Sequence, residues 1–168
     1  IVVITTPNGQ AIPDEPKITA QMQVIDKGPG QINYLSDPPN GYDGFIGIER
    51  RGSSSQDLSD KKPFAVETRD AAGNDLDVPL LGMPAEADWV FIAPYNDKSL
   101  VRDALAHELA RRIMASAPRT RFVEVVLNGD YQGIYLVTEK SNRGKDRVDI
   151  AKLDASDMTG DDLTGGYI

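Results

Sequence analysis

The sequence predicts an α+β fold, an antiparallel β-sheet with one long helix packed on it. Short β-branched and aromatic runs recur along the chain and are separated by Gly, Pro, Asn and Asp, as is typical of strands and turns. One stretch, 99–115, repeats apolar residues at helical spacing. Near the C-terminal end, Asn128-Gly129 joins two further runs and is typical of a tight hairpin. This order of elements indicates a sheet with a helix on one face.

Composition restricts the class of protein. The 168 residues are 40% hydrophobic and 26% charged, which suits one folded domain with a normal core. The net charge of −8 argues against nonspecific binding to nucleic acid or to an anionic membrane, because both need a broad basic field. No run approaches the ~20 apolar residues of a membrane span. Cysteine is absent, which excludes disulfides and sulfur-based metal sites.

Both ends of the sequence look like cuts through a longer polypeptide. The chain starts on the strand-like run Ile1–Ile4 without a methionine, and it stops at Gly165-Gly166-Tyr167-Ile168. We expect one domain or fragment, 1–168. Within it, 1–44 would supply N-terminal strands and a long loop, and 45–168 the remaining sheet and the helix.

The first half of the chain contains four expected strands and one long loop. Ile1–Thr6 is β-branched, and Lys17–Asp26 alternates apolar and polar side chains as a half-buried strand does. Lys27–Tyr42 is rich in Gly, Pro, Asn and Asp, and a loop of this length is either functional or loosely ordered. Phe45–Glu49 and Phe64–Arg69 are the next two strands.

The helix is expected at Ser99–Ala115. Ser99 can cap its N-terminus, while Arg111 and Arg112 lie at the end where cations are favourable. The apolar residues that would face the sheet are Leu100, Ala104, Leu105, Leu109 and Ile113.

The remaining expected strands surround the helix in sequence. Trp89–Ala93 is a continuous apolar run that suits a central strand. Arg121–Leu127 and Gln132–Glu139 form the hairpin, and Val148–Leu153 is a candidate for a short edge strand. Asp154–Gly166 is acidic and contains glycine, so we expect it to be poorly tied down.

A cationic loop lies between the strands Phe45–Glu49 and Phe64–Arg69. It contains Arg50–Gln56, with a glycine and three serines, and is followed by Lys61 and Lys62. Backbone N–H groups, hydroxyls and cations together form a plausible clamp for an anion such as a nucleotide phosphate. The alternative is a polar surface hairpin whose cations are solvated.

A series of motifs resembles the CotH family, which is named for a spore-coat protein and whose members are similar to atypical, secreted-type protein kinases. The match covers about Phe45–Ile168. The motifs follow one another in the family's order: Arg51–Gln56, Lys61–Phe64, Leu80–Pro84 with Asp88–Val90, Asp97–Arg102, Ala117–Glu124, and Leu127–Tyr135 with Thr138–Lys140. The resemblance implies the N-terminal lobe of such a kinase, a sheet with one helix that supplies the nucleotide clamp.

The resemblance also implies roles for the cationic loop. Arg51, Gly52, Ser54 and Ser55 would lie over the phosphates of ATP, and Lys61 or Lys62 would hold the α- and β-phosphates. The sequence does not distinguish the two lysines. For the serines the alternative is an ordinary polar turn, and for each lysine a solvated strand end.

Two helix residues have implied roles with plain alternatives. Glu108 could pair with the clamp lysine, but Arg111 and Arg112 lie three and four residues on and can pair with it instead. Arg102 would face phosphate or brace the loop, or form a surface ion pair with Asp103 or another neighbour.

The end of the hairpin is the implied hinge between two lobes. There, Thr138-Glu139-Lys140 would present backbone groups to adenine, or would be an ordinary strand end that turns to solvent. His107, the lone histidine, is expected to be a packed or surface residue rather than a general base. The Asp154–Asp162 cluster lacks the glycine and terminal glutamate of a calcium loop, so we interpret it as solvated acid.

The function implied is part of a kinase that uses ATP and Mg²⁺. Its substrate would be an extracellular or envelope protein that is phosphorylated on Ser or Thr. The kinase itself would be secreted or located at the cell surface. The metal-binding and catalytic aspartates are expected beyond Ile168, so this segment alone should not catalyse transfer. The alternative is a non-catalytic binding or structural module that contacts protein or polysaccharide through Lys27–Tyr42 and an exposed aromatic patch of Tyr34, Tyr42 and Tyr95.

Overall fold

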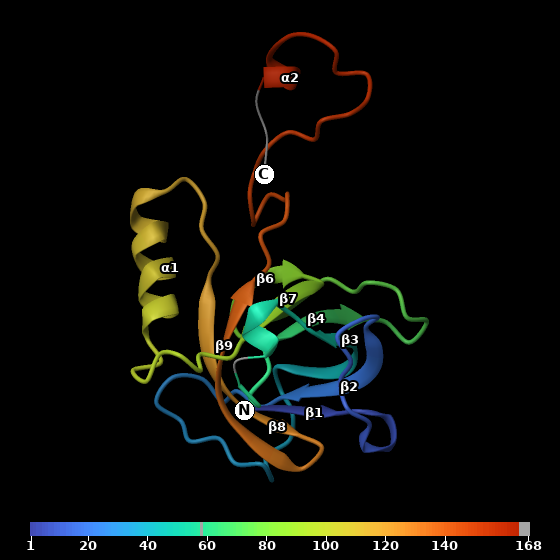
Figure 1. The fold of residues 1–168 in the computed structure, drawn as a ribbon, viewed down its shortest axis with the longest axis vertical. Helices are drawn as coiled ribbons and strands as arrows, with labels where there is room; N and C mark the ends of the chain where they lie inside the picture. Colours follow the sequence, from blue (N-terminus) through green and yellow to red (C-terminus); the bar gives the residue numbers. More distant parts are fainter. Residues whose placement is uncertain (58, 165–168) are drawn as a thin grey trace.

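A seven-stranded closed barrel is the main body of the protein, as Figure 1 shows. The structure, a computed structural model, describes residues 1–57 and 59–164, apart from the side chains of Ser55, Asp162 and Thr164. The strand order around the barrel is β1-β2-β3-β4-β7-β9-β8. The bounds are β1 Val2–Thr5, β2 Ile18–Val24, β3 Tyr42–Arg50, β4 Phe64–Arg69, β7 Asp88–Ile92, β8 Thr120–Leu127 and β9 Asp130–Glu139.

The predicted α+β class is wrong, because the described chain is mostly β and its sheet closes on itself. All neighbouring strands are antiparallel except β1 and β8, which run parallel with Val2 opposite Val125 and Ile4 opposite Leu127. Closure turns one face of the sheet into the barrel interior, which the strands fill with their own side chains. A separate two-stranded sheet, β5 Val78–Leu80 with β6 Met83–Glu86, lies beside the barrel.

The barrel interior is the hydrophobic core. Alternate residues of the strands point inward, as the pattern in β4 shows, where every second residue is buried. Burying each large apolar side chain contributes about 1.5–3 kcal/mol. The largest fully buried side chains of this core are Trp89, Tyr135, Phe91, Ile4, Met22, Ile46 and Ile48.

The seam between β1 and β8 is held by the predicted Asn-Gly turn. Asn128 (φ 53°) and Gly129 (φ 87°) take the left-handed conformations that a tight hairpin between β8 and β9 requires. The amide of Asn128 also binds Thr6: Thr6 N donates to Asn128 Oδ1 at 2.9 Å, and Asn128 Nδ2 donates to Thr6 Oγ1 at 2.9 Å. One side chain therefore ties the turn to the end of β1.

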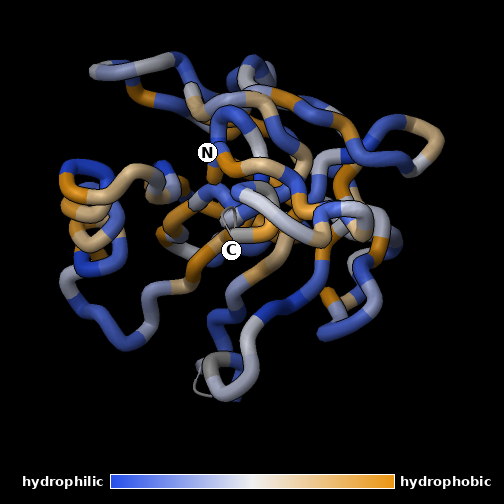
Figure 2. The backbone as a smooth tube through the Cα atoms, turned by 90° about the horizontal axis from the view of Figure 1, so that it is seen from above, coloured by the Kyte–Doolittle hydropathy of each residue, from blue (hydrophilic) through white to orange (hydrophobic). Residues whose placement is uncertain are grey.

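Helix α1, Arg102–Ile113, is shorter than predicted and contains no buried residue. Both views place it beside the barrel rather than on it, and Figure 2 shows apolar stretches on α1 as well as on the strands. Its apolar stripe is exposed: Val101 is 49%, Leu105 56%, Leu109 52% and Ile113 83% exposed. The prediction that this stripe packs on the sheet is wrong, because no residue of α1 is buried.

The start of α1 is capped by Asp97 instead of the predicted Ser99. Arg102 N donates to Asp97 Oδ2 at 2.8 Å, and Ser99 Oγ donates to Asp97 Oδ1 at 2.6 Å. These hydrogen bonds hold the pKa of the Asp97 carboxyl below its usual value, first through the Ser99 hydroxyl and then through the Arg102 amide.

Beyond β9 the chain runs away from the barrel as a mostly exposed segment that ends in the short helix α2, Asp161–Thr164 (Figure 1). The predicted edge strand Val148–Leu153 is wrong, because an isolated bridge between Arg143 and Val148 is the pairing found there. The remaining short helices are the 3₁₀ turns Pro7–Gly9 and Ser54–Gln56. None of the helices among residues 1–57 and 59–164 is long and apolar enough to cross a membrane.

Candidate functional site

The cationic loop folds back on itself at the end of β3. Gln56 is the centre of this turn: its Nε2 donates to the Gly52 carbonyl at 2.6 Å and also to Asp14 Oδ1. Gly52 has φ 93°, a backbone conformation that side chains rarely adopt. Arg51 and Ser54 are exposed, and the side chain of Ser55 lies outside the described residues. The loop is thus a compact turn with Arg51 exposed at its start.

Lys61 and Lys62 point to different places, as neighbours in an extended chain do. Lys62 Nζ donates to the Gln56 carbonyl, so this lysine holds the base of the loop. Lys61 Nζ lies 4.6 Å from the centre of the Tyr135 ring and donates to the Ile134 carbonyl. Burial lowers the pKa of Lys61, because the charged form loses water contacts.

Lys61 lines a pocket of about 340 Å³, here called the Lys61 pocket, which is also lined by Arg102. Two predicted site residues therefore meet here. Arg102 Nε lies 3.5 Å from Asp97 Oδ1, so the predicted surface ion pair forms with Asp97 rather than with Asp103. The other lining residues are Pro63, Ala93, Pro94, Tyr95, Asn96, Asp97 and Asp103.

A second pocket, here called the loop pocket, joins the cationic loop to the end of β9. It measures about 380 Å³ and is lined by Arg51, Gly52 and Lys140. The remaining lining residues are Asp14, Glu15, Lys17, Glu49, Arg50, Ala65, Asp88 and Trp89. The structure thus brings the start of the predicted phosphate loop next to the predicted hinge, although neither Lys61 nor Lys62 lines this pocket.

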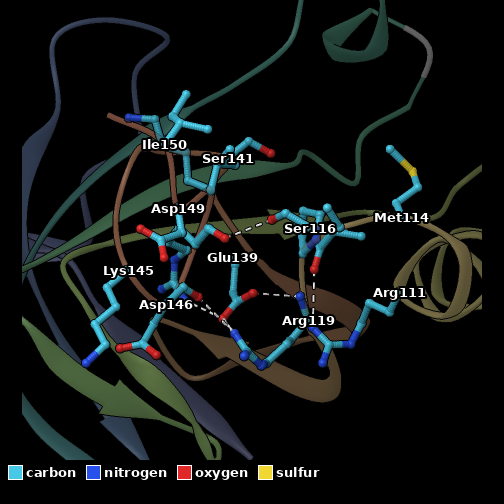
Figure 3. A pocket seen from close by; sticks show the side chains of 16 residues that line it. Arg111, Met114, Ser116, Arg119, Glu139, Ser141, Lys145, Asp146, Asp149 and Ile150 are labelled. Carbon is cyan, nitrogen blue, oxygen red and sulfur yellow. Dashed lines mark hydrogen bonds and ion pairs between the residues drawn. The ribbon is translucent and has the colours of Figure 1, made fainter. Parts of the chain in front are cut away.

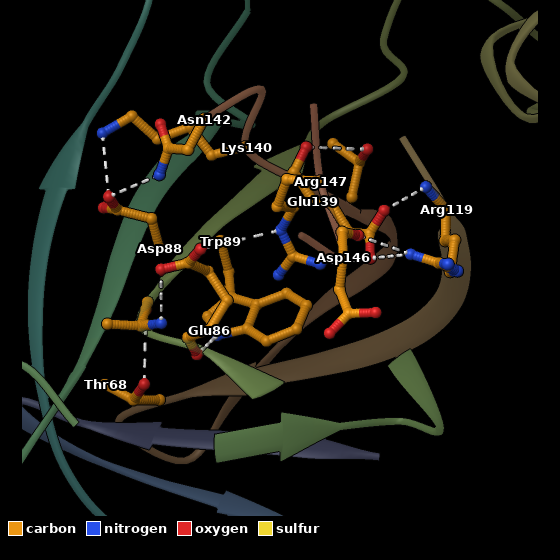
Figure 4. A network of polar contacts seen from close by, with 12 residues as sticks. Thr68, Glu86, Asp88, Trp89, Arg119, Glu139, Lys140, Asn142, Asp146 and Arg147 are labelled. Carbon is orange, nitrogen blue, oxygen red and sulfur yellow. Dashed lines mark hydrogen bonds and ion pairs between the residues drawn. The ribbon is translucent and has the colours of Figure 1, made fainter. Parts of the chain in front are cut away.

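Glu139 is buried between two arginines, as Figure 4 shows. Arg119 N and Nη1 donate to its two carboxylate oxygens at 2.7 and 2.8 Å, and Arg147 Nη1 donates to Oε1. The side chains of Glu139 and Arg147 are 2% and 3% exposed. Arg147 also lies over the Trp89 ring, 5.0 Å from its centre. In this position Glu139 is a strand end locked by ion pairs rather than one that turns to solvent.

A third pocket lies beyond this network and is here called the Arg147 pocket (Figure 3). It measures about 360 Å³ and lies between the C-terminal end of α1 and the segment that follows β9. Its charged lining residues are Arg111, Arg119, Lys140, Lys145, Arg147, Glu139, Asp146 and Asp149. Lys140 lines both this pocket and the loop pocket, so the two lie on either side of the end of β9.

Glu108 lies away from both lysines. It pairs with Arg112 at 2.9 Å on the exposed surface of α1, which is the alternative that the sequence offered. With His107 it lines a small pocket of about 210 Å³ next to Arg111 and Arg119. The role of Glu108 as partner of a clamp lysine stays a prediction that this geometry does not favour.

The three tyrosines of the predicted aromatic patch differ in their surroundings. Tyr34 and Tyr95 are exposed, but Tyr42 donates its hydroxyl to the Phe45 carbonyl at 2.7 Å. Of these three tyrosines, Tyr95 alone lines one of the pockets described above. The patch gives no support to the binding-module alternative.

A magnesium site does not fit the residues present. Across residues 1–57 and 59–164, no group of three or more His, Asp or Glu side chains is arranged to hold a metal ion. Mg²⁺ is held in kinases by carboxylates together with phosphates. No metal-dependent step is therefore assigned to the described residues.

Sequence reasoning missed Arg119 and Arg147. Both were part of recognisable sequence, Arg119 in Ala117–Glu124 and Arg147 in the basic run that follows Lys140. The available signal was Glu139 at the end of a strongly apolar strand. A carboxylate that is buried there needs a cationic partner. Which cation supplies it depends on the fold, because Arg119 is twenty residues from Glu139.

Comparison with known proteins gives the family. No curated protein matches the chain. The family model described as CotH kinase protein matches residues 48–165, which includes the cationic loop, α1, the final hairpin and the Glu139 network. Because this match spans more than half of the sequence, the chain belongs to the CotH kinase protein family.

Proposed function

We propose that this chain is the nucleotide-binding part of a kinase-like protein that transfers phosphate from ATP to Ser or Thr of a protein substrate. The family match supports a kinase-like role. The observation that carries the proposal is the loop pocket, where Arg51 and Gly52 lie against the same space as Lys140 at the end of β9. Loop and strand end are the two parts that a kinase-like clamp has to bring together.

The loop pocket offers suitable groups for both ends of a nucleotide. Arg50 and Arg51 lie at its loop end, and Arg50 Nε is buried without a hydrogen-bond partner among the described residues. Guanidinium groups bind phosphate oxygens through paired N–H donors. Carboxylates such as Glu15 and Asp88 can accept hydrogen bonds from ribose hydroxyls or the adenine amine. Ala65 and Trp89 are the apolar side chains among its lining residues.

The chain's own residues would bind and orient ATP in this arrangement. ATP supplies the phosphoryl group that is transferred. Lys62 keeps the loop folded through the Gln56 carbonyl, so its contribution would be indirect. A secreted or cell-surface location belongs to the same proposal and is supported by the family resemblance alone. Detection of the protein in medium and surface fractions would test it.

The test is calorimetric titration of the chain with ATP in Mg²⁺ buffer. Arg51→Ala should weaken ATP binding by roughly tenfold, the worth of a charge-assisted contact. The matched control is Arg143→Ala, which removes an exposed arginine that lines none of the three pockets. Loss of binding in both variants, or no binding in the unmodified chain, would contradict the proposal. Lys61→Ala and Arg102→Ala test the Lys61 pocket as the competing location.

Transfer itself is tested on the intact protein with ATP labelled in its γ-phosphate and a Ser- and Thr-containing acceptor protein. Labelled acceptor that disappears in Arg51→Ala would connect the loop pocket to activity. Label that persists unchanged in that variant would separate the activity from the loop pocket.

A further inference from the structure

The Arg147 pocket has an excess of positive charge on a chain whose net charge is −8. Five cationic side chains and three carboxylates line it, which leaves two positive charges unbalanced. Glu86 adds one carboxylate behind the pocket, 4.0 Å from Arg147 Nε. A local cationic hollow on an acidic protein attracts anions selectively, because the surrounding surface repels them.

Arg147 has unused hydrogen-bonding capacity in this hollow. Its Nη1 binds Glu139, but its Nε and Nη2 are buried without a hydrogen-bond partner among the described residues. With 3% of the side chain exposed, water reaches these N–H groups poorly. Glu139 is shared with Arg119, and Glu86 lies 4.0 Å from Arg147 Nε, so the charge of Arg147 is only partly neutralised and attracts an anion that enters the pocket.

The rim of the pocket supplies cations that are free to meet a ligand. Lys145 is exposed and forms no ion pair with any residue in the described ranges. Arg111 donates to the Ala117 carbonyl at 3.2 Å and has no carboxylate partner in that part of the chain. Arg119 is held by Glu139 and the Asp146 carbonyl, which fixes its guanidinium at the pocket wall. Figure 3 shows Arg111, Arg119 and Lys145 arranged around the pocket.

The shape and the apolar lining favour a peptide over a nucleotide as the carrier of the anion. None of the residues that line the pocket is aromatic, so a base has no aromatic ring to stack on. Met114, Val148 and Ile150 instead provide apolar contacts for aliphatic groups beside the cations. Clusters of arginine that bind phosphorylated or acidic peptide motifs are a recurring mode of recognition.

We propose that the Arg147 pocket binds a phosphorylated Ser or Thr side chain presented by a peptide. The phosphate would be held by Arg111 and Lys145 at the rim, with the buried charge of Arg147 behind them, and the flanking residues would lie along Met114 and Ile150. Phosphate is favoured over a carboxylate because its three oxygens and nearly double charge match several cationic donors at once. The proposal does not depend on ATP binding to the loop pocket.

The test is fluorescence anisotropy with one labelled peptide in three forms, carrying Ser, phosphoserine or Glu at the same position. The phosphoserine form should bind at least about tenfold more tightly than the Ser form, with the Glu form between them. Arg111→Ala and Lys145→Ala should each weaken phosphopeptide binding by roughly fivefold or more. The matched controls Arg112→Ala and Lys152→Ala remove exposed cations that lie outside the pocket and should change it less than twofold.

The outcomes separate this proposal from the nucleotide site. Equal affinity for the Ser and phosphoserine peptides, or equal losses in Arg111→Ala and Arg112→Ala, would overturn it. Inorganic phosphate that binds as tightly as the phosphopeptide would show that the peptide contributes nothing, and would overturn the peptide part. ATP is titrated into Lys145→Ala and Arg51→Ala to identify the pocket that binds it. Failure of one proposal is therefore distinguishable from failure of the other.

Discussion

The barrel and α1 carry similar apolar residues but use them in opposite ways. Inside the barrel, side chains such as Phe91 and Val137 are fully buried, whereas Leu105 and Leu109 of α1 are about half exposed. Both sets follow the expected period of their element, every second residue in a strand and every third or fourth in the helix. The difference shows that periodicity identifies the face to be covered, while topology decides whether anything within the chain covers it.

The largest effect is expected from emptying the barrel. Phe91→Ala should lower the free energy of unfolding by about 4 kcal/mol, since it removes a fully buried ring and leaves a cavity. Phe122→Ala is the matched control, because Phe122 lies on β8 and is 48% exposed. Urea unfolding measures both variants. Similar losses for the two variants would contradict the structure, in which Phe91 points into the barrel and Phe122 points out of it.

The next effect compares two glutamates from the predicted site. Glu139→Gln should cost about 3 kcal/mol, because it leaves Arg147 buried without its carboxylate. Glu108→Gln should cost less than about 0.5 kcal/mol, because its pair with Arg112 is exposed. Unfolding in urea again gives the values. A Glu139→Gln variant as stable as the unmodified chain would show that the network contributes little to the fold.

Closure of the barrel is tested at its seam. Asn128→Ala should cost about 2 kcal/mol, because it removes the side-chain hydrogen bonds with Thr6 and places alanine at φ 53°. Asn128→Gly keeps the backbone conformation and should cost less. Hydrogen exchange should show lost protection in β1 and β8 for the alanine variant, and uniform loss over all strands would argue against a local latch.

High pH separates buried from exposed hydroxyls. Burial raises the pKa of Tyr135 to about 12, and its hydroxyl donates to the Lys62 carbonyl at 3.0 Å. Since the unfolded value is about 10, the stabilisation by Tyr135 is present below pH 10 and is lost as pH rises towards 12. Tyr135→Phe should cost about 1 kcal/mol at pH 8, a deficit that narrows by pH 11. Tyr95→Phe, at an exposed site, serves as the control.

How much was predictable follows from how local each feature is. The Asn128-Gly129 hairpin and the strand Phe64–Arg69 were predicted because their signals lie within a few residues. Pairing of β1 with β8 joins residues more than a hundred positions apart, and nothing in Ile1–Thr6 distinguishes an open edge from a closed seam. The predicted fold class was wrong because this pairing was not foreseen, and the predicted packing of the helix was wrong as well.

The candidate site divides in the same manner. The cationic loop was found from its composition, and it shares a pocket with Lys140, while the role of Lys140 in a hinge stays a prediction. The choice between Lys61 and Lys62 depended on which side of the chain each side chain leaves, which the sequence does not encode without the register of β4. Neither residue turned out to line the loop pocket. Arg147 was missed because its role depends on contacts with Glu139 and Trp89, two residues on different strands.

The smallest effect on stability is expected from shortening an apolar side chain in the exposed stripe of α1. Leu109→Ala should change the free energy of unfolding by less than about 0.5 kcal/mol, because the side chain is 52% exposed and alanine is the better helix former. Leu136→Ala on β9, with no exposed surface, should cost about 3 kcal/mol.

Hydrogen exchange sharpens the same contrast. A twelve-residue helix without a packed face is marginal on its own, so amides of α1 should exchange far faster than those of β7 or β9. Strong protection of α1, or a loss in Leu109→Ala that approaches the loss in Leu136→Ala, would mean that the stripe is covered in solution. In that case α1 would belong to the core. The barrel and α1 would then both be buried, and they would differ only in the sequence separation of their contacts.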